Sequence, residues 1–289
     1  MTFEMKIPRR TARRRRRRGG TIAGKHCAPG RSGFTCYSNP ELQDIAKTVG
    51  VPLKRRTPTS RIWRDIDGVM NSHCDNEYCW TQVAGVSGPQ RAFRPKMSRE
   101  LRKSSTQWLS TVDISDALRQ YESAIPGFKF LGAVPIDFDE RYANSEQCVC
   151  NALCKIDLLK MWKKQVRQFG VVFNLDAHDL PGSHWVALHC SLENNVVSYY
   201  DSYGFTPPAE VYALIERLKS QSIEIHHAPM RVEINRSRHQ FRDSECGVYA
   251  IYFISHMAQG MSFQNFVNKQ NLNDRHVNRF RSYFFHRYA

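Results

Sequence analysis

The chain has 289 residues, of which 41% are hydrophobic, and this suffices for one large domain with an appendage or for two domains. Its 42 lysines and arginines exceed its 27 aspartates and glutamates, which leaves a net charge of +15. No apolar run approaches the roughly 20 residues of a membrane-spanning helix, and no apolar stretch follows the arginine-rich start to make a signal peptide. We therefore expect a soluble protein made in the cytosol, without a membrane span.

The first 26 residues are rich in arginine. Residues 1–20 contain nine basic residues and one acidic residue, so they supply +8 of the net charge and leave +7 for the rest. Nothing apolar offsets the entropy of ordering, and we expect residues 1–26 to be disordered. A nuclear-import signal and a solvated tail without a partner are two interpretations. The interpretation that we favour is binding of DNA or another polyanion through counterion release by Arg13, Arg14, Arg15, Arg16, Arg17 and Arg18.

Residues 27–98 are predicted to form an N-terminal accessory region. Asn39 is a candidate N-cap, and Pro40 at the first helical position opens a short helix. The glycine, proline and serine residues of the stretch 85–95 have the density of a linker. We therefore expect a second domain from about residue 99 to residue 289.

The second expected domain alternates helical and strand patterns. Ile114, Leu118 and Tyr121 recur on one face of a helix predicted over 113–124, and a longer helix is predicted over 152–169. Short strands, mostly antiparallel, lie between the helices, which makes the expected fold class α+β. The further elements are strands at 128–134, 171–173, 183–191, 196–202, 223–225 and 231–234, and helices at 208–220, 247–257 and 273–285.

Nine cysteines in a chain without a secretory leader favour reduced thiols, catalysis or metal binding over a disulfide framework. The odd number leaves at least one thiol free or intermolecular. The segments 73–79 and 148–154 contain metal-ligand residue types, but neither has the paired two-residue spacing of structural zinc sites. We therefore expect no metal and no cofactor. Cys150 and Cys154 would then share one face of the predicted helix.

Cys246 lies between an acidic polar run and an apolar run, where the helix over 247–257 would begin. A free thiol, with a pKa of roughly 8.5, needs a base, a cation or a helix N-terminus to become a thiolate. Unpaired N–H groups at a helix start favour the thiolate and can bind an oxyanion, and Gly247 permits close backbone approach. A buried filler thiol is the alternative. Glu245 should oppose thiolate formation unless it points to solvent or pairs with a base such as Arg242.

A hairpin with its turn at 192–195 tests which histidine could serve as the base. If the turn is centred on Glu193-Asn194, the position numbers of two facing residues sum to 387. If it is centred on Asn194-Asn195, they sum to 389. Either register puts His184 and Asp201 on one face, and the first puts Tyr203 opposite His184. His184 and Asp201 can therefore form a base and its orienting carboxylate.

Gln240, six residues before Cys246, supplies a neutral amide that can stabilise an oxyanion without competing for the proton of the base. Among the other histidines, His178 lies in the loop before the hairpin. His189 would lie on the opposite face from His184 if the first strand is unbroken. Two satisfied core polar residues beside a buried cysteine remain the alternative to a catalytic set.

The ordered pattern of these residues resembles the ubiquitin-like-protein-specific (SUMO) protease and adenovirus-type cysteine protease superfamily. Within it, the chain is most similar to the polyprotein-processing proteases of large nucleocytoplasmic DNA viruses. The resemblance covers roughly residues 108–260. It rests on His184-Trp185, Asp201-Ser202, Gln240 with Cys246-Gly247, the blocks 174–188 and 200–204, and a Trp108-Leu109 segment whose following residues depart from the commoner spacing.

The resemblance implies a permuted papain-like cysteine protease fold, with the histidine on a strand and the cysteine at a helix start. It implies that Cys246 is the nucleophile, His184 the general base, Asp201 its orienting residue and Gln240 the oxyanion-hole donor. It further implies that substrate is bordered by Trp185, Trp108 and Gly247.

The resemblance also implies the reaction, which is hydrolysis of a viral structural polyprotein after Gly-Gly, where a narrow tunnel admits only residues without side chains. Gly19-Gly20 in the tail suggests that the enzyme could trim its own arginine-rich arm. The alternatives are a deSUMOylase or deubiquitinase acting on host conjugates, and a non-catalytic nucleic-acid-binding virion protein. The expected location is the virion and the host cytoplasm, with the nucleus as an alternative if the tail directs import.

Overall fold

The computed structural model describes residues 26–31, 33–74, 76–84, 89–104, 106–142 and 145–287. They form two compact units. The smaller unit comprises Arg31–Phe93 together with Cys27, and the larger comprises Arg94–Arg287 together with Ala28–Gly30. Residues 1–25 of the expected tail, including the arginine run and Gly19-Gly20, lie outside the described residues.

The smaller unit is helical and has its own core. It contains α2 (Asn39–Thr48), α3 (Thr59–Met70), α4 (Glu77–Ala84) and the 3₁₀ turn η1 (Pro89–Ala92). The N-cap of α2 is Ser38 and not the expected Asn39, because the Ser38 hydroxyl accepts from the Glu41 amide and Glu41 reaches back to form a capping box. The apolar faces of these helices bury Leu42, Ile45, Ile62, Ile66 and Trp80.

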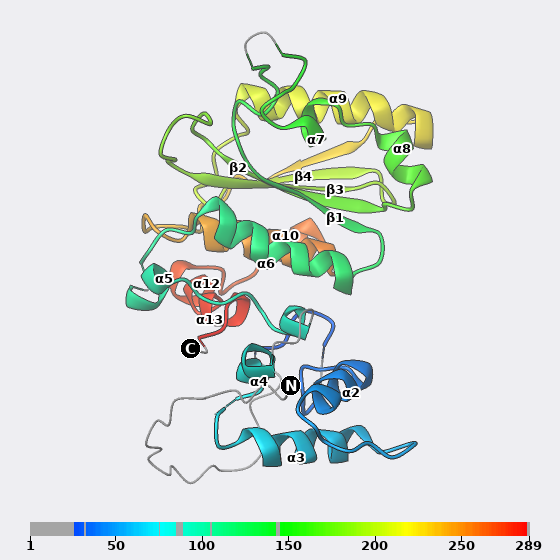
Figure 1. Cartoon of the computed structure of the whole chain (residues 1–289). Helices are drawn as coiled ribbons and strands as arrows, with labels where there is room; N and C mark the ends of the chain where they lie inside the picture. Colours follow the sequence, from blue (N-terminus) through cyan, green and yellow to red (C-terminus); the bar gives the residue numbers. More distant parts are fainter. Residues whose placement is uncertain are drawn as a thin grey trace. The chain divides into compact units, whose positions relative to one another are not determined.

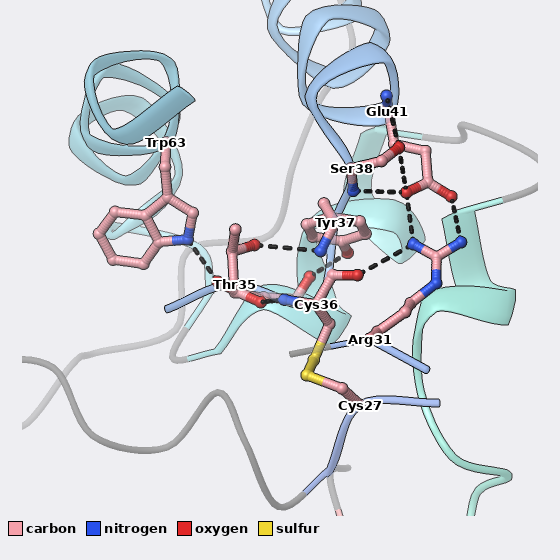
Figure 2. Close-up of a disulfide and its surroundings, with 9 residues drawn as sticks. Cys27, Arg31, Thr35, Cys36, Tyr37, Ser38, Glu41 and Trp63 are labelled. Carbon is pink, nitrogen blue, oxygen red and sulfur yellow. Dashed lines mark hydrogen bonds and ion pairs between the residues drawn. A yellow bond between two sulfur atoms is a disulfide. The ribbon is translucent and has the colours of Figure 1, made fainter. Parts of the chain in front are cut away.

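Figure 2 shows how the chain before α2 is tied to that helix. A disulfide joins Cys27 to Cys36, and Arg31 forms two hydrogen bonds to Glu41, at 2.5 and 3.0 Å, and one to the Cys36 carbonyl at 2.9 Å. Burial raises the pKa of Glu41, but the hydrogen bonds from Arg31 and Ser38 outweigh burial and lower it. Covalent, ionic and capping interactions therefore converge on one helix start.

The expectation of reduced thiols is wrong for six of the nine cysteines. Three short-range disulfides pair Cys27 with Cys36, Cys74 with Cys79 and Cys148 with Cys154. Their Cα–Cα distances of 5.0, 5.5 and 6.3 Å lie within disulfide range, because each pair closes a tight local turn. The described residues contain no cluster of three side chains able to hold a metal ion.

A five-stranded sheet forms the centre of the larger unit, in the order β1-β2-β3-β4-β5. The strands are β1 (Phe128–Pro135), β2 (Gln168–Asn174), β3 (Trp185–Ser191), β4 (Val196–Tyr200) and β5 (Arg231–Ile234). The middle pairs are antiparallel, as expected, but β1 with β2 and β4 with β5 are parallel. The expectation of antiparallel strands was wrong at these two pairs. In each pair, a helical crossover returns the chain to the end of the sheet at which the preceding strand began, so the next strand runs in the same direction.

Helices cover both faces of this sheet (Figure 1). On one face lie α7 (Asn151–Cys154), α8 (Leu158–Lys163) and α9 (Ala209–His226). On the other lie α6 (Thr111–Ala124) and α10 (Cys246–Ala258), and α10 is buried along nearly its whole length. This α+β architecture matches the expected class. The remaining helices are short: α5 (Arg99–Lys103), α11 (Phe263–Val267), α12 (Asp274–Asn278) and α13 (Arg281–Phe284).

The long helix expected over 152–169 is wrong. The chain forms α7 and then α8, because Asp157 caps a new helix by accepting from the Lys160 amide at 2.8 Å. Gln165, with φ of 64°, ends α8 in the left-handed region before β2. Cys150 is the N-cap of α7 and therefore does not share a helical face with Cys154.

Two further boundaries differ from the predicted ones. The expected strand over 223–225 is the last turn of α9, which ends at His227 in the left-handed conformation with φ of 56°. The single helix expected over 273–285 is divided into α12 and α13. No helix among the described residues has the length and apolar character that crossing a membrane requires.

Candidate active site

His184 and Asp201 flank the two antiparallel strands of one hairpin. His184 directly precedes β3, and Asp201 directly follows β4. The register pairs Ala187 with Tyr200, so facing positions sum to 387, the first of the two registers that the turn allows. The Nε2 atom of His184 lies 2.8 Å from Asp201 Oδ1. The hairpin therefore brings together the imidazole and the carboxylate in hydrogen-bonding contact.

The surroundings of Asp201 hold its carboxylate in place. Its side chain is about 1% exposed, and Oδ1 also accepts from the Tyr203 amide at 2.8 Å. The buried Asn235 amide donates to the Asp201 carbonyl at 2.7 Å. The Tyr203 ring stacks on His184 with centroids 4.8 Å apart. The imidazole is thus fixed by a hydrogen bond at one edge and by an aromatic ring on one face.

Cys246 is the first residue of α10 and is about 2% exposed. Cys246 interacts electrostatically with His184, and because His184 Nε2 is used by Asp201, Nδ1 is the ring nitrogen left for sulfur. Burial lowers the pKa of His184, but the interactions with Asp201 and Cys246 outweigh burial and raise it to about 9. This pKa favours a protonated imidazole beside Cys246 at neutral pH.

Gln240 is fully buried in the loop before α10. Its Oε1 atom accepts from the Ser202 hydroxyl at 2.6 Å. Its Nε2 atom donates to the Arg242 carbonyl at 2.5 Å and to the Tyr203 hydroxyl at 3.3 Å. Both amide hydrogens therefore have acceptors in the resting state. A substrate oxygen would replace the longer of these bonds first.

Trp185, Leu109 and Gly247 form a tight packing unit beside Cys246. The Trp185 indole donates to the Leu109 carbonyl at 3.1 Å, and Trp185 is about 5% exposed. A β-carbon added at Gly247 would lie 3.0 Å from Leu109 Cβ and 3.3 Å from Trp185 Cδ1. Gly247 thus lies beneath these side chains, whereas neighbouring Trp108 is about 40% exposed.

A cavity of about 430 Å³ opens beside Trp185. Residues 107–111, 133–135 and 174–182 contribute to its walls. His178 is one of the lining residues and forms a second histidine–carboxylate pair, because its Nδ1 hydrogen-bonds to buried Asp137. This bond raises the pKa of His178. His189, by contrast, is buried within β3 and hydrogen-bonds to Gln168 at 2.9 Å.

Arg281 is a site residue that the sequence patterns did not indicate. Its guanidinium is about 5% exposed and donates to the carbonyls of Gln107, at 2.6 Å, and Ser244, at 2.8 Å. Burial lowers the pKa of Arg281, and the negative charges of Glu245 and Cys246 oppose this shift. Arg281 comes 35 positions after Cys246, and no local motif marks it.

Glu245 differs from both expectations for it. It is fully buried, so it does not point to solvent. Its Oε2 accepts from the Ser244 amide at 3.1 Å, and its Oε1 has no hydrogen-bond partner among the described residues. The cation that interacts with it is Arg281 of α13 and not Arg242. The acidic neighbour of Cys246 is therefore countered by a buried charge from a distant segment.

Comparisons with known proteins identify similar proteases. Residues 159–288 match the Ulp1 protease family, C-terminal catalytic domain. A protein of Acanthamoeba polyphaga mimivirus, named as a thiol protease, is 29% identical over 276 residues, covering 87% of this chain and 89% of its own. A cysteine protease of African swine fever virus is 27% identical over 229 residues, covering 73% of this chain and 83% of its own.

A solved structure supports the fold. The crystal structure of an African swine fever virus protease superposes with a TM-score of 0.65, at 20% identity, over 93% of this chain and 98% of that chain. The structural similarity therefore extends beyond residues 159–288, which the family model matches, to 93% of this chain.

Proposed function

Because this chain carries a catalytic domain of the Ulp1 protease family and is a cysteine protease similar to viral ones, we propose that it is the endopeptidase that processes a viral structural polyprotein after Gly-Gly. One observation carries the catalytic part of this proposal. His184 hydrogen-bonds through Nε2 to Asp201 at 2.8 Å and interacts electrostatically with Cys246. That relay is the arrangement that cysteine catalysis requires.

In the first half of the proposed reaction, the Cys246 thiolate attacks the scissile carbonyl carbon. The Cys246 backbone N–H, which has no intrahelical partner at a helix start, and Gln240 Nε2 stabilise the oxyanion. The His184 imidazolium then donates its proton to the departing amine, and the intermediate collapses to a thioester. Asp201 keeps the imidazole oriented and stabilises its charged form.

In the second half, water replaces the amine. Neutral His184 removes a proton from the water as the water attacks the thioester carbonyl. The second tetrahedral intermediate expels the Cys246 thiolate, and the carboxylic acid product loses its proton to solvent. The imidazolium–thiolate pair is thereby restored, and the net reaction consumes one water for each peptide bond.

The preference for Gly-Gly is supported by the packing around Trp185. A β-carbon at Gly247 would lie only 3.0 Å from Leu109 Cβ and 3.3 Å from Trp185 Cδ1, so these groups form a closely packed boundary. A substrate that passes such a boundary to reach Cys246 would need residues without side chains before the scissile bond. The adjacent cavity of about 430 Å³ has room for the larger residues that precede them.

The test is cleavage of fluorogenic peptides with Gly-Gly, Gly-Ala or Ala-Gly before the scissile bond. We expect the wild type to cut the first peptide only, and to form a covalent adduct with a Gly-Gly vinyl sulfone that intact mass places on Cys246. Cys246→Ala and His184→Ala should abolish cleavage. His73→Ala is the control, since it removes an exposed histidine that belongs neither to the candidate catalytic set nor to the cavity.

The alternatives give different results in the same assay. Some African swine fever virus relatives are named SUMO-1 cysteine proteases, so SUMO and ubiquitin fusions form two further arms. Rapid cleavage of SUMO or ubiquitin from these fusions, together with slow cleavage of every Gly-Gly peptide, would favour the isopeptidase. A wild type that is inert toward all substrates and unreactive with the vinyl sulfone would favour a non-catalytic nucleic-acid-binding protein.

A further inference from the structure

A stack of rings and a guanidinium runs from His184 to the protein surface. Tyr203 stacks on His184, and the Arg238 guanidinium lies 5.2 Å from the centre of the Tyr203 ring. The same guanidinium lies 4.9 Å from the centre of the Phe241 ring, and Phe205 contacts Tyr203 with centroids 6.1 Å apart. We name Tyr203, Phe205, Arg238 and Phe241 the aromatic–arginine ridge.

The outer members of the ridge are unusually exposed. Phe241 and Phe205 are 68% and 66% exposed, the two highest values among the large hydrophobic side chains that the structure describes. Single exposed apolar residues are common on protein surfaces. Two phenylalanines joined through Tyr203 and Arg238 form a continuous patch instead, and burying such a patch against a partner is favourable.

The ridge is held in place before any partner binds. Arg238 Nε donates to the Gln240 carbonyl at 2.8 Å, and the Phe241 amide donates to buried Asp274 at 2.9 Å. A β-carbon at Gly204 would lie 3.0 Å from the Arg236 carbonyl oxygen, so the two loops of the ridge pack backbone against backbone. Such preorganisation lowers the entropy cost of binding.

The charge of the ridge indicates the chemistry of its partner. The loop 236–243 contains three exposed arginines, Arg236, Arg238 and Arg242, and one aspartate. Arginine and aromatic side chains are the residues most enriched where binding energy concentrates in protein interfaces. A segment that combines carboxylates with apolar side chains would neutralise the arginines and bury the phenylalanines.

We propose that the aromatic–arginine ridge is a second binding surface for the protein substrate, and that it takes an acidic segment with apolar side chains lying outside the scissile residues. The ridge is continuous with the reaction centre through the stack of Tyr203 on His184. This inference rests on the proposed endopeptidase function. It adds a requirement on the substrate that the Gly-Gly boundary does not impose.

The test compares three peptides with one Gly-Gly cleavage core. The first is the core alone, and the others carry an added segment of Asp, Glu, Leu and Phe or of Lys, Leu and Phe, placed at either end. We expect the acidic extension to raise kcat/KM about tenfold or more over the core, by an amount that falls as salt rises, and the basic extension to give no gain.

Two variants then assign this gain to the ridge. The double variant Phe205→Ser/Phe241→Ser and the single variant Arg236→Glu should each remove most of the gain and leave cleavage of the core peptide within about twofold. Ile223→Ser on α9 is a matched control that changes another exposed apolar residue. Lys164→Glu, just before β2 at the far end of the sheet, is the charge-reversal control.

Binding separates this inference from the proposed function. Fluorescence anisotropy of the acidic-extended peptide with Cys246→Ala needs no turnover, so it reports on the ridge even if no peptide is cut. Loss of this binding in the Phe205→Ser/Phe241→Ser background supports the ridge. Equal binding with and without those substitutions, or equal affinity for the acidic and basic extensions, overturns the inference whatever the protease assay gives.

Discussion

The Arg281 guanidinium donates a hydrogen bond to the Ser244 carbonyl at 2.8 Å, two residues before the candidate nucleophile. The same side chain donates to the Gln107 carbonyl at 2.6 Å, next to the segment that packs on Trp185. Arg281 therefore joins the loop that presents Cys246 to one wall of the cavity. Its charge also interacts with that of buried Glu245, whose Oε1 atom has no hydrogen-bond partner in the part of the chain that the structure describes.

Replacing Arg281 should lower the stability of the protein. Arg281→Gln removes the hydrogen bonds from the guanidinium to the carbonyls of Gln107 and Ser244, and each lost hydrogen bond from a charged donor costs about 1.5–3 kcal/mol of unfolding free energy. Urea unfolding measures this loss. Arg281→Lys should restore only part of the lost stability, because the single ammonium group of lysine cannot replace the two guanidinium nitrogens that donate to two separate carbonyls. Arg279→Gln, at an exposed neighbour, is the control, and equal stability of all three variants would contradict this role.

Activity should fall at alkaline pH as His184 loses its proton. The pKa of His184 is raised from 6.5 to about 9, so the imidazolium that protonates the leaving amine disappears as pH rises through about 9. By linkage, the stability from this raised pKa is fully present below pH 6.5 and is lost as pH rises through about 9. The measurement is the pH profile of kcat/KM.

Asp201→Asn is the companion variant for this profile. It removes the carboxylate that helps to raise the His184 pKa, so the alkaline limb should move toward neutral pH by about one to two units. Glu193→Gln, at the exposed turn of the hairpin, is the control and should leave the limb in place. An alkaline limb that Asp201→Asn does not move would mean that another group controls this ionisation.

A methyl group at Gly247 should disturb the reaction centre. Gly247→Ala places a β-carbon 3.0 Å from Leu109 Cβ, so the backbone that carries Cys246 or the Leu109 side chain must shift. Overpacking of this kind costs about 1–3 kcal/mol, and a displacement of the thiolate by about 1 Å can lower the rate about a hundredfold. Thermal unfolding and peptide cleavage measure the two effects.

Gly68→Ala supplies the contrast, because a β-carbon there meets no heavy atom within 4 Å. Gly68 lies in α3, where alanine is favoured over glycine, so this variant should be stabilised by about 0.5–1 kcal/mol. Full activity and unchanged stability of Gly247→Ala would show that the packing around Trp185 adapts, and the structural argument for a rigid Gly-Gly boundary would fail.

The arginine run should bind DNA without sequence preference. Replacing Arg13–Arg18 by alanine should weaken binding and reduce the slope of log K against log salt by about 5, since each phosphate contact contributes roughly 0.9. Fluorescence anisotropy with random duplexes over a salt series gives this slope. Cys246→Ala should bind DNA as the wild type does. An unchanged slope after the six substitutions would place DNA binding elsewhere or exclude it.

Local patterns in the sequence predicted what local interactions control. The apolar spacing of Ile114, Leu118 and Tyr121 marked α6, and the turn after β3 limited the hairpin to two registers that both bring His184 to the face of Asp201. The change from polar to apolar residues marked the start of α10 at Cys246. Each of these features depends on residues close together in the chain, so a short window of sequence contains the information.

Features that depend on distant segments needed the tertiary structure. The parallel direction of β1 and β5 follows from where the crossover helices return the chain, and alternation within a strand does not encode that direction. Arg281 is the cation that interacts electrostatically with Glu245, and Arg281 also hydrogen-bonds to Gln107, 174 positions away. Sequence alone therefore indicated the candidate site residues and the local geometry around them. Tertiary packing decided which distant charge lies near Glu245. A buried charge without an opposite charge nearby is costly in free energy, and only the folded chain brings the two segments together.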